Sequence, residues 1–289
     1  MSDPDLEELT ATAVKAALDA GSLIRSHQGG KIEVQHKSGG HTYASQVVTE
    51  VDRKAQDMIL NHLHCSCDQY DLALLTEESE DDRSRFEKEF FWCIDPLDGT
   101  LPFTRGEPGY SVSIALVARG GAPQIGVVYD PVREVLWQAT RGKGVHRNGQ
   151  SWDLGAGGRE LTFTYDRSFE SHPQRERVFK ALESYALSIG LSGLSAIHYG
   201  GAVINACHAL EQAPGCHFKF AKPQEGGGSI WDYAATACLF LEAGAVVSDV
   251  HGSALDLNRK DSTFMNHRGA LYATDSALAE RIREILGQN

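Results

Sequence analysis

The chain has 289 residues, of which 42% are hydrophobic and 23% are charged, and its formal net charge is −12. This composition excludes a disordered chain, because apolar residues are abundant, and it disfavours a primary binder of nucleic acid polymers, which would carry a basic excess. No stretch approaches the roughly 18 apolar residues of a membrane span. The N-terminus, MSDPDLEEL, lacks the basic and apolar regions of a signal peptide, and the 6 cysteines form no C-x-x-C pair. We therefore expect a globular cytoplasmic protein.

Helical and strand-like patterns follow one another in the first half of the chain. Apolar residues at helical spacing predict amphipathic helices over residues 5–26 and 50–64, joined by a loop that reaches about residue 41. Short apolar runs predict strands at 72–75 and 90–94, and acidic residues follow both at once. Three further strands, separated by turn signals, predict an antiparallel sheet and cover residues 111–117, 124–129 and 135–139.

The glycine-rich segment 155–158 is the predicted boundary between two subdomains, residues 1–154 and residues 155–289. The second half contains a predicted strand at 161–165 and an apolar segment at 245–250. Together with the first half, this mixture predicts an α+β fold with two layered sheets in closely joined subdomains. Helices are predicted over residues 174–187, 202–212, 230–243 and 276–286.

The sequence His62-Leu-His64-Cys65-Ser-Cys67 has the composition of a metal site. Its second half is missing, because no ligand pair with zinc-finger spacing follows. We therefore interpret this segment as the polar end of a helix.

Acidic motifs lie at the ends or starts of four apolar elements, and the most informative is Ile94-Asp95-Pro-Leu-Asp98-Gly-Thr100. Its two carboxylates are expected within a few ångströms of each other, and Pro96 is expected to fix a turn that leaves the Leu97 carbonyl pointing the same way. The backbone N–H groups of Gly99 and Thr100 would then face outward, where they can cradle a phosphate oxygen. The other motifs are Val47-Val-Thr-Glu-Val-Asp52, Leu74-Leu-Thr-Glu77-Glu78 and Ile230-Trp-Asp232.

Each motif also has a purely structural interpretation. In combination these interpretations are weaker, because a cluster of unpaired carboxylates near a sheet end is costly and a bound dication is the usual remedy. Hard oxygen ligands in this number favour Mg²⁺ or Ca²⁺ over zinc. The structural alternatives are a type I turn at Asp95 to Gly99, capping boxes at Thr49 with Asp52 and Ser229 with Asp232, and a solvated acidic surface from Glu77 onward.

The four motifs resemble the signatures of the inositol monophosphatase superfamily. Trp92-Cys-Ile-Asp95-Pro-Leu-Asp98-Gly-Thr100 is similar to its W-x-x-D-P-(I/L)-D-G-T signature, and Ile230-Trp-Asp232-Tyr-Ala-Ala is similar to its W-D-x-A-A signature. The segments ending at Asp52 and at Ser79 match the other two acidic motifs in order and spacing. The resemblance extends from about residue 10 to about residue 280.

The resemblance implies a layered αβαβα fold and a Mg²⁺-dependent, lithium-sensitive phosphomonoesterase, which forms a homodimer in this family. The N-terminal subdomain would carry most of the metal-binding motifs, and the C-terminal subdomain would complete the active site. Two Mg²⁺ ions are implied, with a third, weaker ion bound through water by Glu77. The ligands of one ion would be Glu77, Asp95 and the Leu97 carbonyl, and those of the second would be Asp95, Asp98 and Asp232.

The remaining implied roles concern catalysis. Asp52 and Thr100 would orient or deprotonate the attacking water, with Glu77 as a third catalytic residue. Gly99 and Thr100 would donate backbone N–H groups to the phosphate. A hypothesis from a different class is a non-catalytic protein that binds a phosphorylated ligand or a partner. That hypothesis predicts the loss of a metal-ligating carboxylate or of the threonine, and all are present.

The resemblance leaves two substrate classes open. Glu225 lies seven residues before Asp232, at the position of the glutamate that contacts polyol hydroxyls in inositol monophosphatases. Residues 255–266 instead resemble the 3′(2′),5′-bisphosphate nucleotidases, which would act on 3′-phosphoadenosine 5′-phosphate. We predict an inositol monophosphatase-type activity, with the nucleotidase as the alternative.

The segment from Ala213 to Ser229 departs from the family pattern. Lys219 and Lys222 within it are interpreted either as part of a solvated loop or as a second phosphate clamp, which would favour a bisphosphate substrate. Glu225 has the corresponding alternative of a plain loop acid. The Arg and Gly-Ser that usually precede the 202–212 helix in the family are replaced by His198 and Gly200-Gly201.

Overall fold

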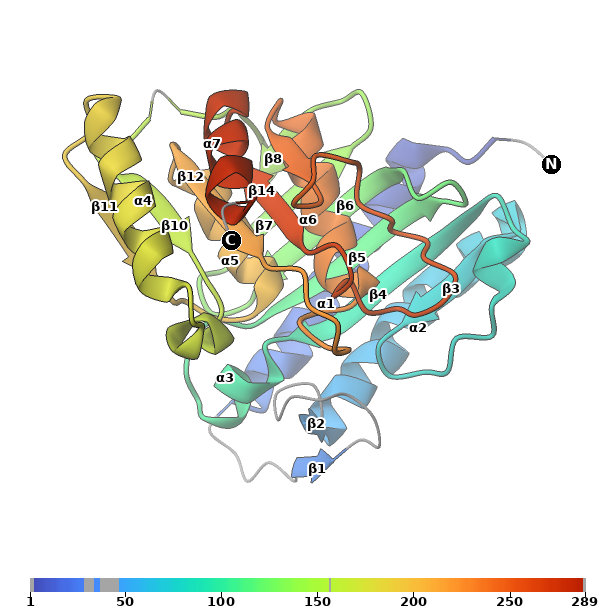
Figure 1. The fold of residues 1–289 in the computed structure, drawn as a ribbon. Helices are drawn as coiled ribbons and strands as arrows, with labels where there is room; N and C mark the ends of the chain where they lie inside the picture. The colour runs from blue at the N-terminus through green and yellow to red at the C-terminus, as the bar shows by residue number, and fades with distance from the viewer. Residues whose placement is uncertain (1–2, 29–33, 37–46, 156, 288–289) are drawn as a thin grey trace.

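The computed structural model describes residues 3–28, 34–36, 47–155 and 157–287, and the side chains of 34–36 and 47–49 lie outside the description. These residues form two large β-sheets and a set of helices arranged in layers (Figure 1). Within the described ranges, none of the helices combines the length and the apolar character that a bilayer span requires. The helices are α1 (Leu6–Ser26), α2 (Glu50–Tyr70), α3 (Thr100–Thr104), α4 (Arg175–Ser188), α5 (Ala202–Glu211), α6 (Ile230–Glu242) and α7 (Ser276–Gly287).

The first sheet has seven strands in the order β3-β4-β5-β6-β7-β8-β9. β3 runs parallel to β4, and each later pair is antiparallel. Alternation along β4 sends Phe91 and Cys93 into one buried cluster and Trp92 and Ile94 into another, so both faces of the sheet are covered. Its strands are β3 (Ala73–Thr76), β4 (Phe90–Asp98), β5 (Ser111–Ala118), β6 (Pro123–Asp130), β7 (Val135–Thr140), β8 (Val145–Arg147) and β9 (Gln150–Trp152).

The second sheet has five strands in the order β11-β10-β12-β14-β13. β10 is parallel to both of its neighbours, whereas β14 is antiparallel to β12 and β13. A separate antiparallel pair, β1 (Val34–His36) with β2 (Val47–Thr49), precedes α2. The strands of the second sheet are β10 (Leu161–Thr164), β11 (Leu194–Ile197), β12 (Gly215–Lys219), β13 (Val246–Ser248) and β14 (Ala270–Ala273).

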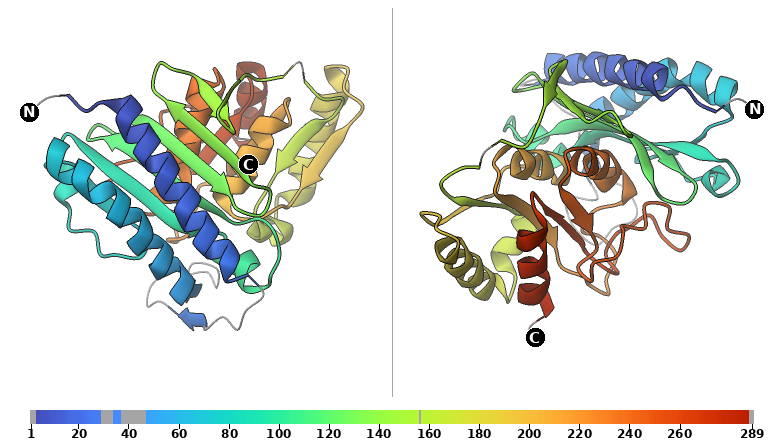
Figure 2. Two further views of the ribbon diagram at one scale, coloured as in Figure 1. Left: turned by 180° about the vertical axis from the view of Figure 1, so that it is seen from behind. Right: turned by 90° about the horizontal axis from the view of Figure 1, so that it is seen from above.

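Helices and sheets alternate to give five layers, as the view from above shows (Figure 2). Helices α1 and α2 cover the outer face of the first sheet, and α5 and α6 fill the space between the two sheets. Helices α4 and α7 pack on the outer face of the second sheet. The predicted αβαβα layering is therefore confirmed.

Most predicted elements are confirmed, with two instructive extensions. The second predicted helix continues to Tyr70 and includes His62 to Cys67, so the interpretation of this segment as the polar end of a helix is confirmed. His62 pairs with Asp19, and Cys65 is a free, exposed thiol. The strand predicted at 90–94 continues to Asp98. The predicted loop that follows the first helix lies largely outside the described residues.

Several short strands were not predicted, and they include β11, β12 and β14. Each has only four or five residues. Such runs carry little periodicity of their own, and pairing with partners far along the chain stabilises them. The sequence does not predict β12, and this strand ends at Lys219, close to the site described below.

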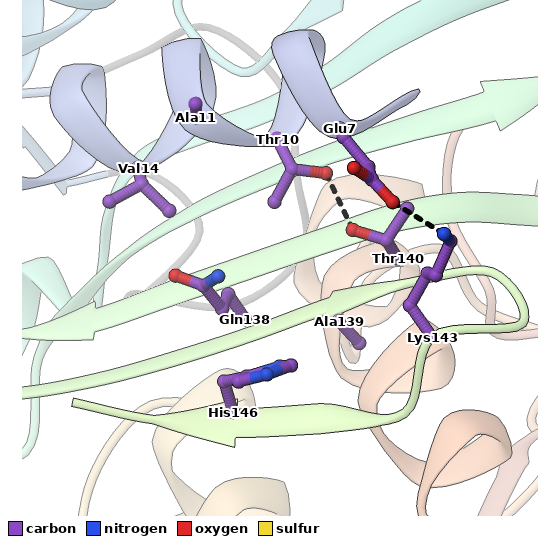
Figure 3. A pocket seen from close by; sticks show the side chains of 9 residues that line it. All are labelled: Glu7, Thr10, Ala11, Val14, Gln138, Ala139, Thr140, Lys143 and His146. Atoms are coloured by element: carbon purple, nitrogen blue, oxygen red, sulfur yellow. Dashed lines mark hydrogen bonds and ion pairs between the residues drawn. The ribbon is translucent and has the colours of Figure 1, made fainter. Parts of the chain in front are cut away.

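A hollow of about 460 Å³ lies between α1 and strands β7 and β8 (Figure 3). Across it, the hydroxyls of Thr10 and Thr140 are 2.7 Å apart, and Lys143 pairs with Glu7 at 2.5 Å. None of its lining residues belongs to the acidic motifs.

Candidate active site

The acidic motif at residues 95–98 lies within a bulged strand, so the expected turn at Pro96 and the alternative of a type I turn are both wrong. Asp95 pairs with Ser113 and Asp98 pairs with Ser111, so three steps along β4 correspond to two along β5. The Leu97 N–H donates to Asp95 Oδ1 at 3.0 Å. The bulge interrupts the ladder between these two pairs, and oxygens of Asp95 and Asp98 lie close together there.

Three carboxylates from distant parts of the chain meet at this bulge. Asp95, Asp98 and Asp232 each offer an oxygen, and these oxygens lie within 4.8 Å of one another. Asp95 and Asp98 are buried at the end of β4, and Asp232 is partly buried in the first turn of α6. Among the described residues, this is the group of acidic, histidine or cysteine side chains that could hold a metal ion.

Burial and mutual repulsion raise the pKa values of the carboxylates in the cluster. Burial raises the pKa of Asp95 well above its usual value, and the charges of Glu77 and Asp232 raise it further. Burial and the Asp232 charge likewise raise the pKa of Asp98. Burial raises the pKa of Asp232 to about 6, although Lys219 opposes the shift. Carboxylate oxygens are the ligands that a hard dication such as Mg²⁺ prefers, and its charge would offset their mutual repulsion. These residues therefore fit the implied metal.

Asp98 joins the first sheet to the second half of the chain. Its two carboxylate oxygens accept hydrogen bonds from the N–H groups of Ala202 at 3.2 Å and Val203 at 3.0 Å, in the first turn of α5. The carboxylate thus satisfies amides at a helix N-terminus, where negative charge is favoured. A β-carbon at Gly201 would overlap the Asp98 carboxylate, so this arrangement of β4 and α5 requires glycine at position 201.

Asp52 and Thr100 form a hydrogen-bonded pair beside the cluster. The Thr100 hydroxyl lies 3.0 Å from Asp52 Oδ1 and 3.2 Å from the Leu97 carbonyl oxygen, and it can donate to either. The Leu97 carbonyl is therefore already near one donor, yet it retains a lone pair for a further ligand. Gly99 precedes this pair with φ of 88°, which lets the chain turn into the short helix α3. The structure thus places Asp52, Leu97, Gly99 and Thr100 together.

Glu77 is held at the end of β3 by two elements. Its N–H donates to the Ile94 carbonyl at 3.1 Å, which continues the ladder to β4. One turn after Asp52 on α2, the Gln56 amide accepts from the Glu78 N–H at 3.2 Å and donates to the Ser79 hydroxyl at 2.9 Å. Gln56 is a buried residue that the sequence analysis missed, because a single amide in a helix gives no signal.

Asp232 also completes the N-terminus of its own helix. Its Oδ2 accepts from the Ser229 N–H at 2.6 Å, so the capping interpretation of this motif is correct and coexists with membership of the cluster. The corresponding interpretation of Thr49 depends on a side chain outside the described residues.

Glu225 and Lys219 differ sharply in their surroundings. Glu225 is exposed, and its carboxylate accepts from the Ser262 hydroxyl at 3.1 Å. The side chain of Lys219 is only 15% exposed and pairs with Asp166 at 2.8 Å, so the solvated-loop interpretation of Lys219 is wrong. Burial alone would lower the pKa of Lys219, but Asp166, Tyr233 and Asp232 outweigh it and raise that pKa. The cation therefore acts electrostatically on the acidic cluster.

The layered fold and the buried carboxylate cluster are those expected of a metal-dependent phosphate monoester hydrolase. The family model of the "Inositol monophosphatase family" matches residues 5–288, and the chain belongs to this family. Members of the family are Mg²⁺-dependent phosphatases.

Individual proteins are similar to this chain over most of its length. "Nus factor SuhB" of Escherichia coli strain K12 is 32% identical over 248 residues, which cover 83% of this chain and 84% of that protein. "Inositol monophosphatase 1" of Solanum lycopersicum is 32% identical over 265 residues, which cover 87% of this chain and 88% of that protein. The crystal structure of the extragenic suppressor protein suhB from Bartonella henselae superposes with a TM-score of 0.73 at 24% identity, and covers 98% of this chain and 99% of its own.

Proposed function

We propose that this protein hydrolyses a small phosphate monoester, of the inositol phosphate type, by two-metal activation of water. The observation that carries the proposal is the convergence of Asp95, Asp98 and Asp232 within 4.8 Å, beside the Asp52–Thr100 pair. A bare carboxylate cluster would repel a phosphate monoester, which carries about two negative charges.

The ligands proposed for the metal are those that the motifs indicate. Glu77, Asp95 and the Leu97 carbonyl would hold one Mg²⁺, and Asp95, Asp98 and Asp232 would hold the second, with Glu77 serving any third ion through water. When bound, Mg²⁺ supplies positive charge for the phosphate and lowers the pKa of water.

The protein's own groups position the reactants. The Thr100 hydroxyl bridges toward Asp52, so the pair can fix a water by hydrogen bonds and Asp52 can accept its proton. The N–H groups of Gly99 and Thr100 are proposed donors to the phosphate oxygens. No cysteine nucleophile is needed; burial raises the pKa of the Cys93 and Cys207 thiols, which keeps them inert.

Two ester classes are candidates. Relatives that are named inositol monophosphatases support an inositol phosphate, with Glu225 as the proposed contact to polyol hydroxyls. The second candidate is 3′-phosphoadenosine 5′-phosphate, and the observation in its favour is the buried cation of Lys219 beside Asp232. A non-catalytic role in binding a phosphorylated ligand or a partner is a weaker alternative, because the hydrolytic residues are present.

The test is a phosphate-release assay with inositol 1-phosphate and 3′-phosphoadenosine 5′-phosphate, each with Mg²⁺, with EDTA, and with added Li⁺. We expect release that requires Mg²⁺ and that Li⁺ inhibits. Release that is unaffected by chelation would contradict the mechanism, and a strong preference for the nucleotide would contradict the first substrate choice. Binding without hydrolysis would support the non-catalytic alternative.

Three further features are proposed with this function. Small esters, and not nucleic acid polymers or membranes, are the proposed partners. The cytoplasm is the proposed compartment, because all six cysteines are free thiols. The homodimer stays a prediction, and light scattering on the purified protein tests it.

A further inference from the structure

A fully buried arginine follows the segment that carries Glu77. Arg85 belongs to the short 3₁₀ helix Ser84–Phe86, and only 1% of the residue is exposed. Its guanidinium donates to the Asp81 carboxylate at 2.9 Å and lies over the Phe86 ring, 4.0 Å from the ring centre. Asp81 comes four residues after Glu77. The arginine therefore holds the far end of the segment that begins with this proposed metal ligand.

The same guanidinium reaches the connection between β13 and β14, residues 249–269. Arg85 donates through one Nη to the Asn258 side-chain oxygen, and through the other to the Arg259 carbonyl at 3.0 Å. The Asn258 amide donates back to the Arg85 carbonyl at 3.2 Å and to the Arg119 carbonyl at 2.8 Å. In Figure 1 this connection extends from the second sheet toward β3. Arg85 thus joins two segments that are 173 positions apart in the chain.

The same connection holds the N-terminus of α6. Phe264 forms an antiparallel bridge with Ser229, the N-cap residue of this helix. Next to the bridge, the Ile230 N–H donates to the Thr263 carbonyl at 2.9 Å. The Ser229 N–H in turn donates to Asp232 Oδ2 at 2.6 Å. The backbone that the connection holds is therefore the backbone that orients the Asp232 carboxylate.

A single residue links the two ends of this connection. The Arg259 carbonyl accepts from Arg85, and the Arg259 guanidinium donates to the Phe264 carbonyl at 2.6 Å. Phe264 is the residue that bridges to the N-cap of α6. Contacts therefore run without interruption from Asp81, on the side of Glu77, to the start of the helix that carries Asp232.

The contacts of Arg85 specify geometry more than they add stability. A buried ion pair contributes little net stability compared with apolar side chains of the same size, because both charges lose their hydration. A planar guanidinium, in contrast, fixes the directions of several acceptors at once. Arg85 donates to a carboxylate, a side-chain amide and a backbone carbonyl, and these acceptors come from two distant segments. The arginine therefore limits how far the two segments can separate.

We propose that Arg85, together with Asn258, is a positioning residue for the metal site, and that it sets the separation between Glu77 and Asp232. The inference rests on the proposed function, in which Glu77 and Asp232 hold different Mg²⁺ ions and Asp95 contacts both. Arg85 acts through these carboxylates and not on the substrate. Loss of its contacts should therefore weaken Mg²⁺ binding by about tenfold, as for other residues that orient metal ligands, with little change in kcat at saturating Mg²⁺.

Calorimetric titration of MgCl₂ onto the full-length protein, dialysed against EDTA and then against buffer, tests the inference without catalysis. We expect the Mg²⁺ Kd to rise about tenfold in Arg85→Lys, which keeps the charge beside Asp81 but cannot reach all of the acceptors. Asn258→Ala should raise it by a similar factor. The double variant should bind Mg²⁺ no more weakly than either single variant, because both changes remove the same contact.

Two further measurements separate positioning from general stability. The rise in unfolding temperature on adding Mg²⁺ should be smaller in Arg85→Lys and Asn258→Ala than in the wild type. In phosphate release, the half-saturating Mg²⁺ concentration should increase by the same factor as the calorimetric Kd. An arginine that only stabilised the fold would lower the unfolding temperature in EDTA and leave both Mg²⁺ measurements unchanged.

Arg177→Lys is the matched control. Arg177 is partly buried, and its guanidinium donates to the Ile285 carbonyl at 2.7 Å, so it joins α4 to α7 on the outer face of the second sheet. We expect the Mg²⁺ Kd of this variant to equal that of the wild type even where its unfolding temperature falls. An equal weakening of Mg²⁺ binding in Arg177→Lys would attribute the effect to lost stability and would overturn the proposal.

The remaining outcomes distinguish this inference from the proposed function. An unchanged Mg²⁺ Kd in Arg85→Lys and Asn258→Ala would overturn the positioning role and leave the phosphatase intact. If Arg85→Lys does not fold, Asn258→Ala decides by itself, because it keeps the ion pair between Arg85 and Asp81. Wild-type protein that binds no Mg²⁺ would overturn the proposed function, and this inference with it.

Discussion

Asp98 at the end of β4 accepts a 3.0 Å hydrogen bond from the backbone N–H of Val203, a residue 105 positions later in the chain. Together with the Ala202 contact, this bond orients a carboxylate of the acidic cluster from outside its own sheet. The geometry of the cluster thus depends on how closely α5 approaches β4.

Gly201→Ala should disturb this approach. The new methyl group would overlap the Asp98 carboxylate, so we expect Asp98 to shift and Mg²⁺ to bind about tenfold more weakly. The Mg²⁺ dependence of phosphate release measures the change. Gly120→Ala is the control, because a β-carbon there meets nothing within 4 Å; an equal effect of both substitutions would contradict the role assigned to Gly201.

Asp95→Asn should abolish Mg²⁺-dependent hydrolysis without unfolding the protein. Asp95 lies in the middle of the cluster, and the substitution removes one charge from a set of mutually repelling carboxylates. The thermal unfolding temperature in EDTA should therefore equal or exceed that of the wild type. Turnover near the wild-type level would show that the site is assigned wrongly.

Thr100→Val should lower kcat by about a hundredfold, which is the lower end of the rate effects typical of general acid–base catalysis. The hydroxyl that reaches Asp52 at 3.0 Å disappears while the size of the side chain is kept. Thr100→Ser retains the hydroxyl and should recover most of the rate. Similar rates for the Val and Ser variants would mean that the hydroxyl has no part in catalysis.

Stability without metal should fall as the pH rises, and Mg²⁺ should reverse this trend. The pKa of Asp232 is raised to about 6 from an unfolded value of about 3.9, so the folded protein binds more protons between these values and loses stability as the pH increases through them. Mg²⁺ requires the deprotonated carboxylates, so its stabilising effect should grow over the same interval. Unfolding temperatures with Mg²⁺ and with EDTA from about pH 4 to about pH 8 test this, and a Mg²⁺ shift independent of pH would contradict it.

Gln56→Leu should weaken Mg²⁺ binding by roughly tenfold while kcat at saturating Mg²⁺ changes little. The buried amide holds the Glu78 N–H and the Ser79 hydroxyl, and so positions the segment that carries Glu77. Gln56→Glu keeps the acceptor and should be less affected. A loss of kcat alone would exclude this positioning role.

The residues of the acidic cluster could be predicted from the sequence because each one ends or begins a strongly patterned element. Asp95 follows the apolar run of β4 and Asp232 lies in the first turn of an apolar helix, so local patterns indicated both positions. The surroundings of Lys219 could not be predicted, because β12 is a short strand whose partners lie 50 or more residues away. At Asp95 the pattern predicts a turn where the structure has a bulge, since Pro and Gly are typical of both.

The placement of α6 has a consequence for the unfolding of the protein. This helix belongs to the second half of the chain, yet its buried residues join those of β5, β6 and β7 in one apolar cluster, which also includes Tyr272 of the second sheet. Neither sheet can lose its packing without exposing part of the other, so the two halves should unfold in one cooperative transition. The carboxylate cluster, which draws Asp95 from one half and Asp232 from the other, would disappear in that same transition.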